Sequence, residues 1–311
     1  MAPAWTPNVN GQQGLTQDPI NSWCRGRFHY SGCLSKHGFR TRNRLHWVGR
    51  LPRGEREVVH MPLWLQALLW GTAAGGALVL GAALSWRWNL PAKLVSSVMS
   101  FGAGVLISAL AFELVDEAVQ GGGLWPTVAG FLAGSVVYVA ANMTLSRAGA
   151  KHRKRSGNQQ PSEAENPGSG TAIAFGALLD GVPESVVLGV GMLAGGAVSP
   201  AMMAAVFISN VPEGLSGSAG MKKAGRSARY VFGLWGGIAV LCGVASLIGY
   251  VALENAPGAV VAFITAVAAG GILAMLADTM IPEAFEEHHN LTGLTASLGF
   301  LAAFTIHHLG E

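Results

Sequence analysis

The chain has 311 residues, of which half are hydrophobic and only 12% are charged, and its mean hydropathy is +0.39. A soluble domain carries roughly 25% charged residues, so this composition excludes an ordinary soluble protein and predicts a membrane protein. The net charge of +3 does not indicate a nucleic-acid partner, because the basic residues lie in short loops and in the N-terminal segment.

Residues 1–60 form a polar, basic segment that differs from the rest of the chain. The segment contains nine Lys or Arg residues but no apolar run, and it lacks the pattern of a signal peptide. Met61 stands directly before the first apolar run. We therefore expect a disordered tail or a translation start at Met61, with residues 61–311 forming the membrane domain.

Eight apolar runs of about 20 residues follow, each long enough to cross a bilayer. The predicted fold is an all-α, polytopic membrane bundle of about eight transmembrane helices. Glycines within the runs, such as Gly81 and Gly270, predict close packing between helices. The runs lie near residues 62–85, 94–115, 124–145, 171–194, 200–220, 230–253, 258–280 and 292–309.

The loop charges predict how these spans are oriented, because short loops rich in Lys and Arg stay cytoplasmic. After residue 60 every Lys and Arg lies in one of three loops, which eight spans place on one face. The longest of them, residues 146–170, is too polar to fold by itself. We predict that these loops are cytoplasmic and that both termini lie outside the cell membrane. The eleven basic residues are Arg87, Lys93, Arg147, Lys151, Arg153, Lys154, Arg155, Lys222, Lys223, Arg226 and Arg229.

Two similar motifs place carboxylates in the middle of the fourth and fifth spans. They are Asp180-Gly-Val-Pro-Glu184 and Ser209-Asn-Val-Pro-Glu213. An ionised acid within hydrocarbon is costly and normally marks a functional site with a partner. Because none of the apolar runs after residue 60 contains a Lys or Arg, we expect these acids to have no basic partner in the protein. The simplest remaining partner is a cation from outside.

The proline in each motif adds a backbone oxygen at the same depth. Pro183 and Pro212 cannot donate to the carbonyl one turn earlier, so we expect proline-broken fourth and fifth helices. Ser209 and Asn210 share a face with Glu213, as residues three and four apart do, and together these groups form an oxygen-rich cage that suits divalent cations. A simple kink with protonated acids is the alternative, but two such motifs in adjacent spans are typical of transporters built from discontinuous helices.

These stretches resemble the ZIP family of divalent metal transporters. The resemblance rests on Ile208-Ser-Asn-Val-Pro-Glu-Gly-Leu215, on Leu179-Asp-Gly-Val-Pro-Glu-Ser185 and on Ala277-Asp-Thr-Met-Ile-Pro-Glu-Ala284, and it covers about residue 62 to the end. It implies a metal site between spans four and five and metal uptake towards the cytosol by an elevator-like movement of a transport bundle. It also implies a transporter in the plasma membrane rather than an enzyme, with no catalytic cofactor.

The resemblance also implies which residues bind the metal. Glu184 and Glu213 match the family's shared carboxylates, whereas Asp180 stands where the family usually has His. The fourth and fifth spans contain no His, and imidazole favours zinc while oxygen ligands favour manganese, so zinc is the family default and manganese or iron is the alternative cargo. The candidate ligands are Asp180, Glu184, Ser209, Asn210, Glu213, Glu113, Asp278 and Glu283.

Two other functions stay open at this point. The departures at Asp180 and Gly181, and a sixth span without an acid, would fit a transport-inactive relative that acts as a metal sensor or scaffold. An intramembrane metalloenzyme is the weaker alternative, because the chain contains no His-Glu-x-x-His motif. The expected partners are the metal ion and the bilayer, with a homodimer left open.

Overall fold

A computed structural model describes residues 61–154, 164–166, 169–196, 198–287 and 291–310. Every regular element within these residues is a helix, which confirms the predicted all-α fold. Residues 1–60 and the middle of the predicted loop 146–170 lie outside the described residues, so the predictions made for them stay predictions.

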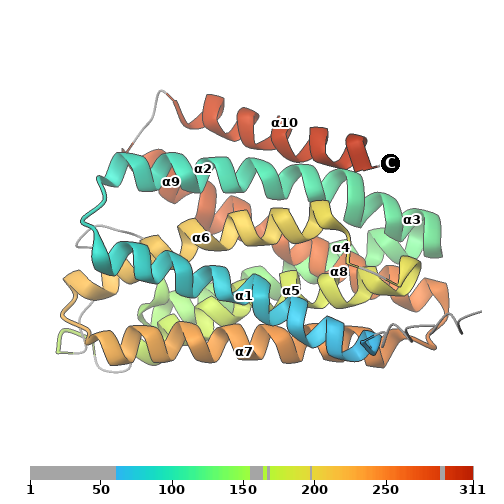
Figure 1. Ribbon diagram of the computed structural model, residues 1–311, viewed down its shortest axis with the longest axis horizontal. Coiled ribbons are helices and arrows are strands. Elements are labelled where there is room, and N and C mark those ends of the chain that lie inside the picture. Colours follow the sequence, from blue (N-terminus) through green and yellow to red (C-terminus); the bar gives the residue numbers. More distant parts are fainter. Residues whose placement is uncertain (1–60, 155–163, 167–168, 197, 288–290, 311) are drawn as a thin grey trace, which may run out of the picture. The chain divides into compact units, whose positions relative to one another are not determined.

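Helices lie at all eight predicted positions, and Figure 1 shows the long ones running along a common direction. Three short π-helical segments extend α2, α4 and α8. The elements are α1 (Leu63–Arg87), α2 (Ala92–Ala109), η1 (Leu110–Val115), α3 (Asp116–Gly122), α4 (Leu124–Leu145), η2 (Ser146–Ala150), α5 (Ser169–Gly195), α6 (Pro200–Lys223), α7 (Ala228–Leu253), α8 (Gly258–Met275), η3 (Leu276–Met280), α9 (Ile281–Glu287) and α10 (Thr292–Gly310).

Six helical stretches in the described residues are long and apolar enough to cross a membrane, which indicates a multi-pass membrane protein. The two remaining predicted spans, α6 and α10, are helices that fall outside this set. In α6 the reason is its polar content, which includes Ser209, Asn210 and Glu213. This helix packs against α1, α2 and α10, and these three side chains are buried, so α6 is surrounded by protein at this depth.

The helices form two packing groups. In the first, α1 packs along both α6 and α7, and α5 packs on α7; in the second, α4 packs on α8 and α2 on α10. Contacts of α2 with α6 and of α5 with α8 join the groups. The two proline-containing helices, α5 and α6, touch each other little, and α1 lies against both. Side chains from other parts of the chain can therefore lie between the two proline motifs.

Glycine makes the closest helix approaches possible, as the sequence predicts. A Cβ added to Gly81 would lie 2.1 Å from the carbonyl oxygen of Val211, and one added to Gly214 would lie 2.1 Å from that of Leu78. Alanine at either position would push α1 and α6 apart. Gly270 holds α8 against α4 in the same way, since its added Cβ would lie 2.0 Å from the carbonyl oxygen of Phe131.

Both proline-containing helices continue through their prolines. Pro183 lies inside the 27-residue helix α5, and Pro212 lies inside the 24-residue helix α6. The break that we expected at each proline is therefore limited to the missing backbone N–H, because neighbouring helices keep both halves aligned.

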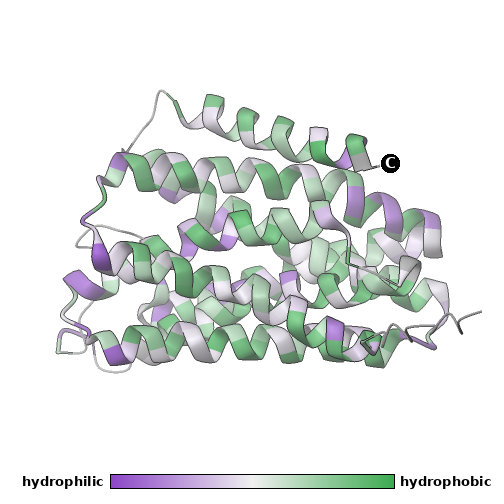
Figure 2. Cartoon of the chain, viewed as in Figure 1, coloured by the Kyte–Doolittle hydropathy of each residue, from purple (hydrophilic) through white to green (hydrophobic). Residues whose placement is uncertain are grey.

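Hydrophilic residues gather at the ends of the bundle. Figure 2 shows hydrophobic colours along most of α1, α2 and α7, with hydrophilic residues in α3 and near the helix ends. The loops that join α1 to α2 and α6 to α7 lie at the same end (Figure 1). Arg226, in the loop between α6 and α7, donates a hydrogen bond of 2.9 Å to Ser169, the first residue of α5. The start of α5, where the predicted loop 146–170 ends, therefore lies at this end as well. The loops from α1 to α2 and from α6 to α7 and the start of α5 thus lie at one end, while the orientation of that end in a membrane stays a prediction.

Candidate functional site

The three carboxylates of the proline motifs are buried in the middle of the bundle. Asp180 and Glu184 lie one turn apart on α5, and Glu213 lies on α6; their residues are 1%, 1% and 4% exposed. Burial of this kind requires a partner, because an isolated carboxylate away from water costs several kcal/mol, of the order expected for buried ions.

The expectation that these acids have no basic partner is wrong. Arg153 and Lys154, which belong to the loop after α4, reach into the bundle and are themselves 4% and 1% exposed. The Arg153 guanidinium donates from Nε to Asp180 Oδ2 and from Nη2 to Asp180 Oδ1, both at 2.9 Å. The Asp180 site is thus a bidentate ion pair.

Lys154 connects the two motifs. Its Nζ lies 3.3 Å from Asp180 Oδ2 on α5 and 3.0 Å from Glu213 Oε2 on α6. Burial by itself lowers the pKa of Lys154, but the carboxylates of Asp180 and Glu213 outweigh it, so the pKa is raised and the ammonium stays charged. One side chain therefore joins two helices that touch each other little.

A glycine turn directs this loop back into the bundle. Gly149 adopts φ +106°, in the left-handed region, and a Cβ there would lie 2.8 Å from the side-chain nitrogen of Asn166. The following residue, Ala150, is fully buried. Gly176 then leaves space on α5, because its added Cβ would lie 2.5 Å from Cδ of Arg153. Without these two glycines the guanidinium could not reach Asp180 along this path.

Two polar residues of α4 complete the surroundings of Asp180. The Tyr138 hydroxyl donates to Asp180 Oδ1 at 2.6 Å and accepts from Arg153 Nη2 at 3.0 Å. Arg153 Nη1 donates to Asn142 Oδ1 at 2.9 Å. Tyr138 and Asn142 thus hydrogen-bond directly to Asp180 or Arg153, so the pair between Arg153 and Asp180 is fixed in geometry as well as in charge.

Glu184 differs from its neighbours. Both of its carboxylate oxygens are buried, and no donor within the described residues hydrogen-bonds either of them. It lies one turn from Asp180 on the same face of α5. Glu184 is therefore the carboxylate of the cluster whose oxygens have no hydrogen-bond donor within the described residues.

Ser209 and Asn210 lie in the same buried region of α6, and each donates a hydrogen bond to a backbone carbonyl. Ser209 Oγ donates to the carbonyl oxygen of Val206 at 2.9 Å. Asn210 Nδ2 donates to the carbonyl oxygen of Ala74 on α1 at 3.0 Å. The side-chain oxygens of Ser209 and Asn210 keep lone pairs that can accept, so both could be ligands of a cation.

The structure places Glu113 outside this cluster. Glu113 lies in η1, where Ser199 donates to its Oε2 at 3.1 Å and His307 Nδ1 lies 3.5 Å from its Oε1. It lines a cavity of about 170 Å³ together with Glu117 and Val187. Val187 follows Glu184 by three residues on α5, so this acidic cavity lies about one turn from the buried cluster.

The two candidate ligands of the predicted seventh span do not join the cluster as a compact set. Asp278 in η3 is exposed, and its Oδ2 lies 3.5 Å from Nδ2 of Asn142. Glu283 in α9 is half-buried and is close enough to Lys154 to contribute to its raised pKa. The candidate set therefore divides into a core of five residues, with Glu283 near it and with Asp278 and Glu113 apart.

Together with Arg153 and Lys154, the core of five residues contains three carboxylates and two basic groups. When all are ionised, one negative charge remains uncompensated, and the oxygen acceptors around it are suited to a cation. Across the residues that the structure describes, no three His, Cys, Asp or Glu side chains are grouped so as to hold a metal ion. A metal would need the carboxylates to exchange their present basic partners for it.

Sequence reasoning missed Arg153, Lys154, Tyr138 and Asn142. The small residues Ala148-Gly149-Ala150, directly before the basic run, were the available signal for a tight turn back towards the bundle. Gly176, one turn before Asp180, was a second signal. Comparison with known proteins adds no identification, since no protein-family profile matches the chain and no curated protein is significantly similar to it.

Proposed function

We propose that this chain is a divalent metal cation transporter of the plasma membrane, which moves zinc, or manganese or iron, towards the cytosol through the carboxylates of α5 and α6. The proposal agrees with the resemblance of the proline motifs to the ZIP family. Orientation follows from the basic loops at one end of the bundle, which would be cytoplasmic.

The observation that carries the proposal is the state of Glu184. This carboxylate is 1% exposed, and neither of its oxygens accepts a hydrogen bond from the described residues. An ionisable side chain buried at membrane depth in that condition normally marks a functional site. Glu213, Asp180 and the acceptor oxygens of Ser209 and Asn210 provide further oxygen ligands of the kind that hard divalent cations use.

The ion pairs suggest how the site would be loaded. A divalent metal that binds Glu184 and Glu213 brings the positive charge that Lys154 now supplies, so the ammonium can leave without exposing an unpaired acid. Lys154 and Arg153 would then act as tethered counter-ions that hold the carboxylates between transport events. This exchange avoids the large cost of an empty, fully ionised cluster in a low-dielectric region.

The acidic cavity at Glu113 and Glu117 supports a route to the cluster. It reaches Val187 on α5, and rows of acidic side chains raise the local concentration of cations. In the proposed orientation this cavity faces the outside, since it includes Ser199 at the start of α6, the end opposite to Lys222 and Lys223.

Metal uptake into proteoliposomes tests the proposal. We expect Glu184→Gln and Glu213→Gln each to abolish uptake of zinc, manganese and ferrous iron, because the amide keeps the shape but removes the charge that binds the metal. Glu254→Gln, an exposed position at the end of α7, is the matched control and should transport normally. Unchanged uptake in both site variants would defeat the proposal.

A transport-inactive metal sensor or scaffold is the second candidate, and a specific observation favours it. Asp180 and Glu213 are already paired with Arg153 and Lys154 at 2.9–3.3 Å, an arrangement that would also suit a permanently closed core. The two candidates differ in one experiment: a sensor gains thermal stability from a metal that binds at Glu184 but accumulates none of it in proteoliposomes, whereas a transporter does both.

A further inference from the structure

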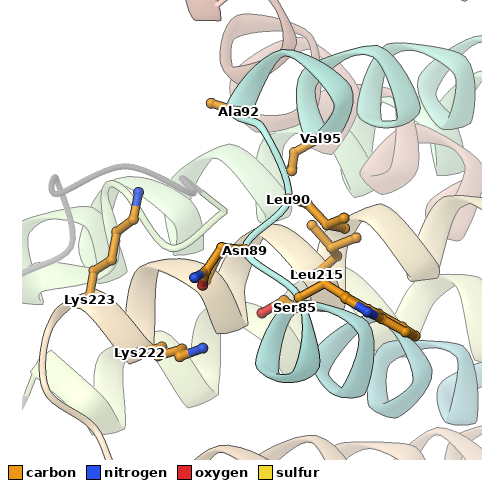
Figure 3. Close-up of a pocket in the computed structure, with 10 residues that line it drawn as sticks. Ser85, Asn89, Leu90, Ala92, Val95, Leu215, Lys222 and Lys223 are labelled. Carbon is orange, nitrogen blue, oxygen red and sulfur yellow. The ribbon is translucent and has the colours of Figure 1, made fainter.

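A pocket between the ends of α1, α2 and α6 has the chemistry of an anion site. Its volume is about 280 Å³, and its lining includes the polar residues Ser85, Asn89, Lys222 and Lys223. Figure 3 shows the Ser85 hydroxyl and the Lys222 ammonium pointing towards the space beside Asn89. Among the described residues that line it, none is acidic.

Ser85 is the first sign that something binds there. The residue is only 5% exposed, and its Oγ has no hydrogen-bond partner in the part of the chain that the structure describes. A buried hydroxyl without a partner costs free energy. A ligand that accepts a hydrogen bond would remove this cost, and the hydroxyl is aimed into the pocket (Figure 3).

The start of α2 is the second sign. Ala92, its first residue, lines the pocket, and no side chain caps the N-terminus of this 18-residue helix. The first backbone N–H groups of a helix lack partners within the helix, and its dipole places partial positive charge there, so such an end attracts phosphate.

The lysines supply full positive charge at the same place. Lys222 is held towards α1 by a hydrogen bond of 3.1 Å to the carbonyl oxygen of Trp86 and by its position 5.4 Å from the centre of the Trp86 ring. Lys223 follows it at the end of α6. The Lys222 ammonium, the Ser85 hydroxyl, which has no hydrogen-bond partner within the described residues, and the start of α2 thus line one space, and Lys223 adds a positive charge at its edge.

The depth and the walls of the pocket indicate the form of the ligand. The pocket lies where the membrane-spanning helix α1 ends and α2 begins, and Leu90, Val95 and Leu215 form an apolar wall beside the polar groups. Trp88, also in the lining, is of the residue type that is enriched at the headgroup level of a bilayer. A ligand with a phosphate next to an acyl chain would satisfy both parts.

We propose that this pocket binds a phosphate group, and that the acidic phospholipid headgroup is the source that its apolar wall favours. The lipid phosphate would accept hydrogen bonds from Ser85 and the start of α2 and would pair with Lys222 and Lys223. Basic pockets between helices on the cytoplasmic side bind acidic headgroups in this way. The inference does not depend on the proposed transport activity.

Native mass spectrometry of the full chain in neutral detergent tests this proposal. The chain should retain phosphatidylglycerol in preference to phosphatidylcholine with the same acyl chains. Lys222→Gln combined with Lys223→Gln should weaken the retention about tenfold, because each basic residue near the surface contributes to the attraction. Arg147→Gln combined with Arg229→Gln, which removes the same charge from exposed positions outside the pocket, should leave it unchanged.

Two further experiments distinguish a lipid phosphate from free phosphate and test whether the ligand binds in this pocket. If inorganic phosphate alone binds and displaces the lipid, the phosphate chemistry is supported with the free ion as ligand; if it does not displace the lipid, the headgroup is supported. Ser85→Leu fills the pocket without changing charge and should remove the preference. Equal retention of both lipids by the unmodified chain, an equal loss in the two double variants, or full preference in Ser85→Leu would overturn the proposal.

Discussion

The two proline motifs share the residues Val-Pro-Glu but differ in what surrounds their acids. On α5, Asp180 is held by Arg153, Lys154 and Tyr138, whereas Glu184, one turn later, accepts no hydrogen bond from the described residues. On α6, Glu213 meets Lys154 alone among the salt bridges of the described residues. The same short pattern therefore contains a compensated acid, an uncompensated acid and one that shares its partner.

This difference shows that the motif determines how deep each acid lies in the bundle, but not which basic side chains neutralise it. The depth of each acid follows from its place in the middle of an apolar run. The partners come from α4 and from the loop after it, at positions 26 to 59 residues away from the acids that they pair with. Arg153 is a loop residue by sequence, yet its guanidinium lies at the depth of Asp180.

The largest stability effect is expected at the compensated acid. Arg153→Gln leaves Asp180 buried and without its bidentate partner, so we expect a loss of about 3–5 kcal/mol of stability, as for other broken buried pairs. Thermal unfolding in detergent measures this loss. The variant that also carries Asp180→Asn should recover part of the loss, since no unpaired charge remains; a double variant that is as unstable as the sum of both single variants would contradict the ion pair.

A smaller effect is expected from the hydroxyl that orients this pair. Tyr138→Phe removes the hydrogen bond to Asp180 while it keeps the ring, and hydrogen bonds to charged groups are worth about 1.5–3 kcal/mol. The same unfolding measurement applies. Tyr250→Phe on α7, for which the structure gives no side-chain hydrogen bond within the described residues, is the control and should change the stability little.

The glycine that makes room for the guanidinium gives a steric test. Gly176→Ala places a Cβ 2.5 Å from Cδ of Arg153, and overpacking of this kind costs about 1–3 kcal/mol. Gly191→Ala lies on the same helix and meets nothing within 4 Å, so it should be neutral or stabilising. Equal effects of the two substitutions would show that Arg153 does not cross α5 at Gly176.

Lys154, which pairs with both Asp180 and Glu213, gives the prediction with the smallest expected effect. Lys154→Gln removes the ammonium that competes with a metal, so we expect the metal to bind about tenfold more tightly, equivalent to about 1.4 kcal/mol. The stabilisation that zinc or manganese adds to thermal unfolding reports this affinity. Lys151→Gln, an exposed change in the same turn, should behave as the unmodified chain. A weaker metal response in Lys154→Gln would make Lys154 part of the binding site rather than a competitor.

Much of the bundle could be predicted from the sequence because its physical causes are local. Apolar runs of bilayer length form helices wherever water is excluded, and all eight appear at the predicted positions. Glycine within them allows backbones to meet, as at Gly81 and Gly214. The acids of the two motifs are buried because each lies in the middle of such a run.

The composition of the candidate site could be predicted only in part. Asp180, Glu184, Ser209, Asn210 and Glu213 follow from helical spacing and are found buried in one region. Glu113 could not be separated from them by sequence, since its distance from the cluster depends on how η1 and α10 pack around Ser199 and His307. The exposure of Asp278 likewise depends on how η3 packs against its neighbours, which the sequence does not show.

The sequence by itself determined that this chain is a helical membrane protein with acids at the depth of its two proline motifs, since hydrophobicity and helical period act over a few neighbouring residues. Only the tertiary structure decided that Arg153 and Lys154 neutralise two of those acids and that Glu184 has no hydrogen-bond donor among the residues that the structure describes. An ion pair forms between side chains that the fold brings within about 3 Å, and a turn at Gly149 brings these together by a path that charge counting along the chain does not reveal.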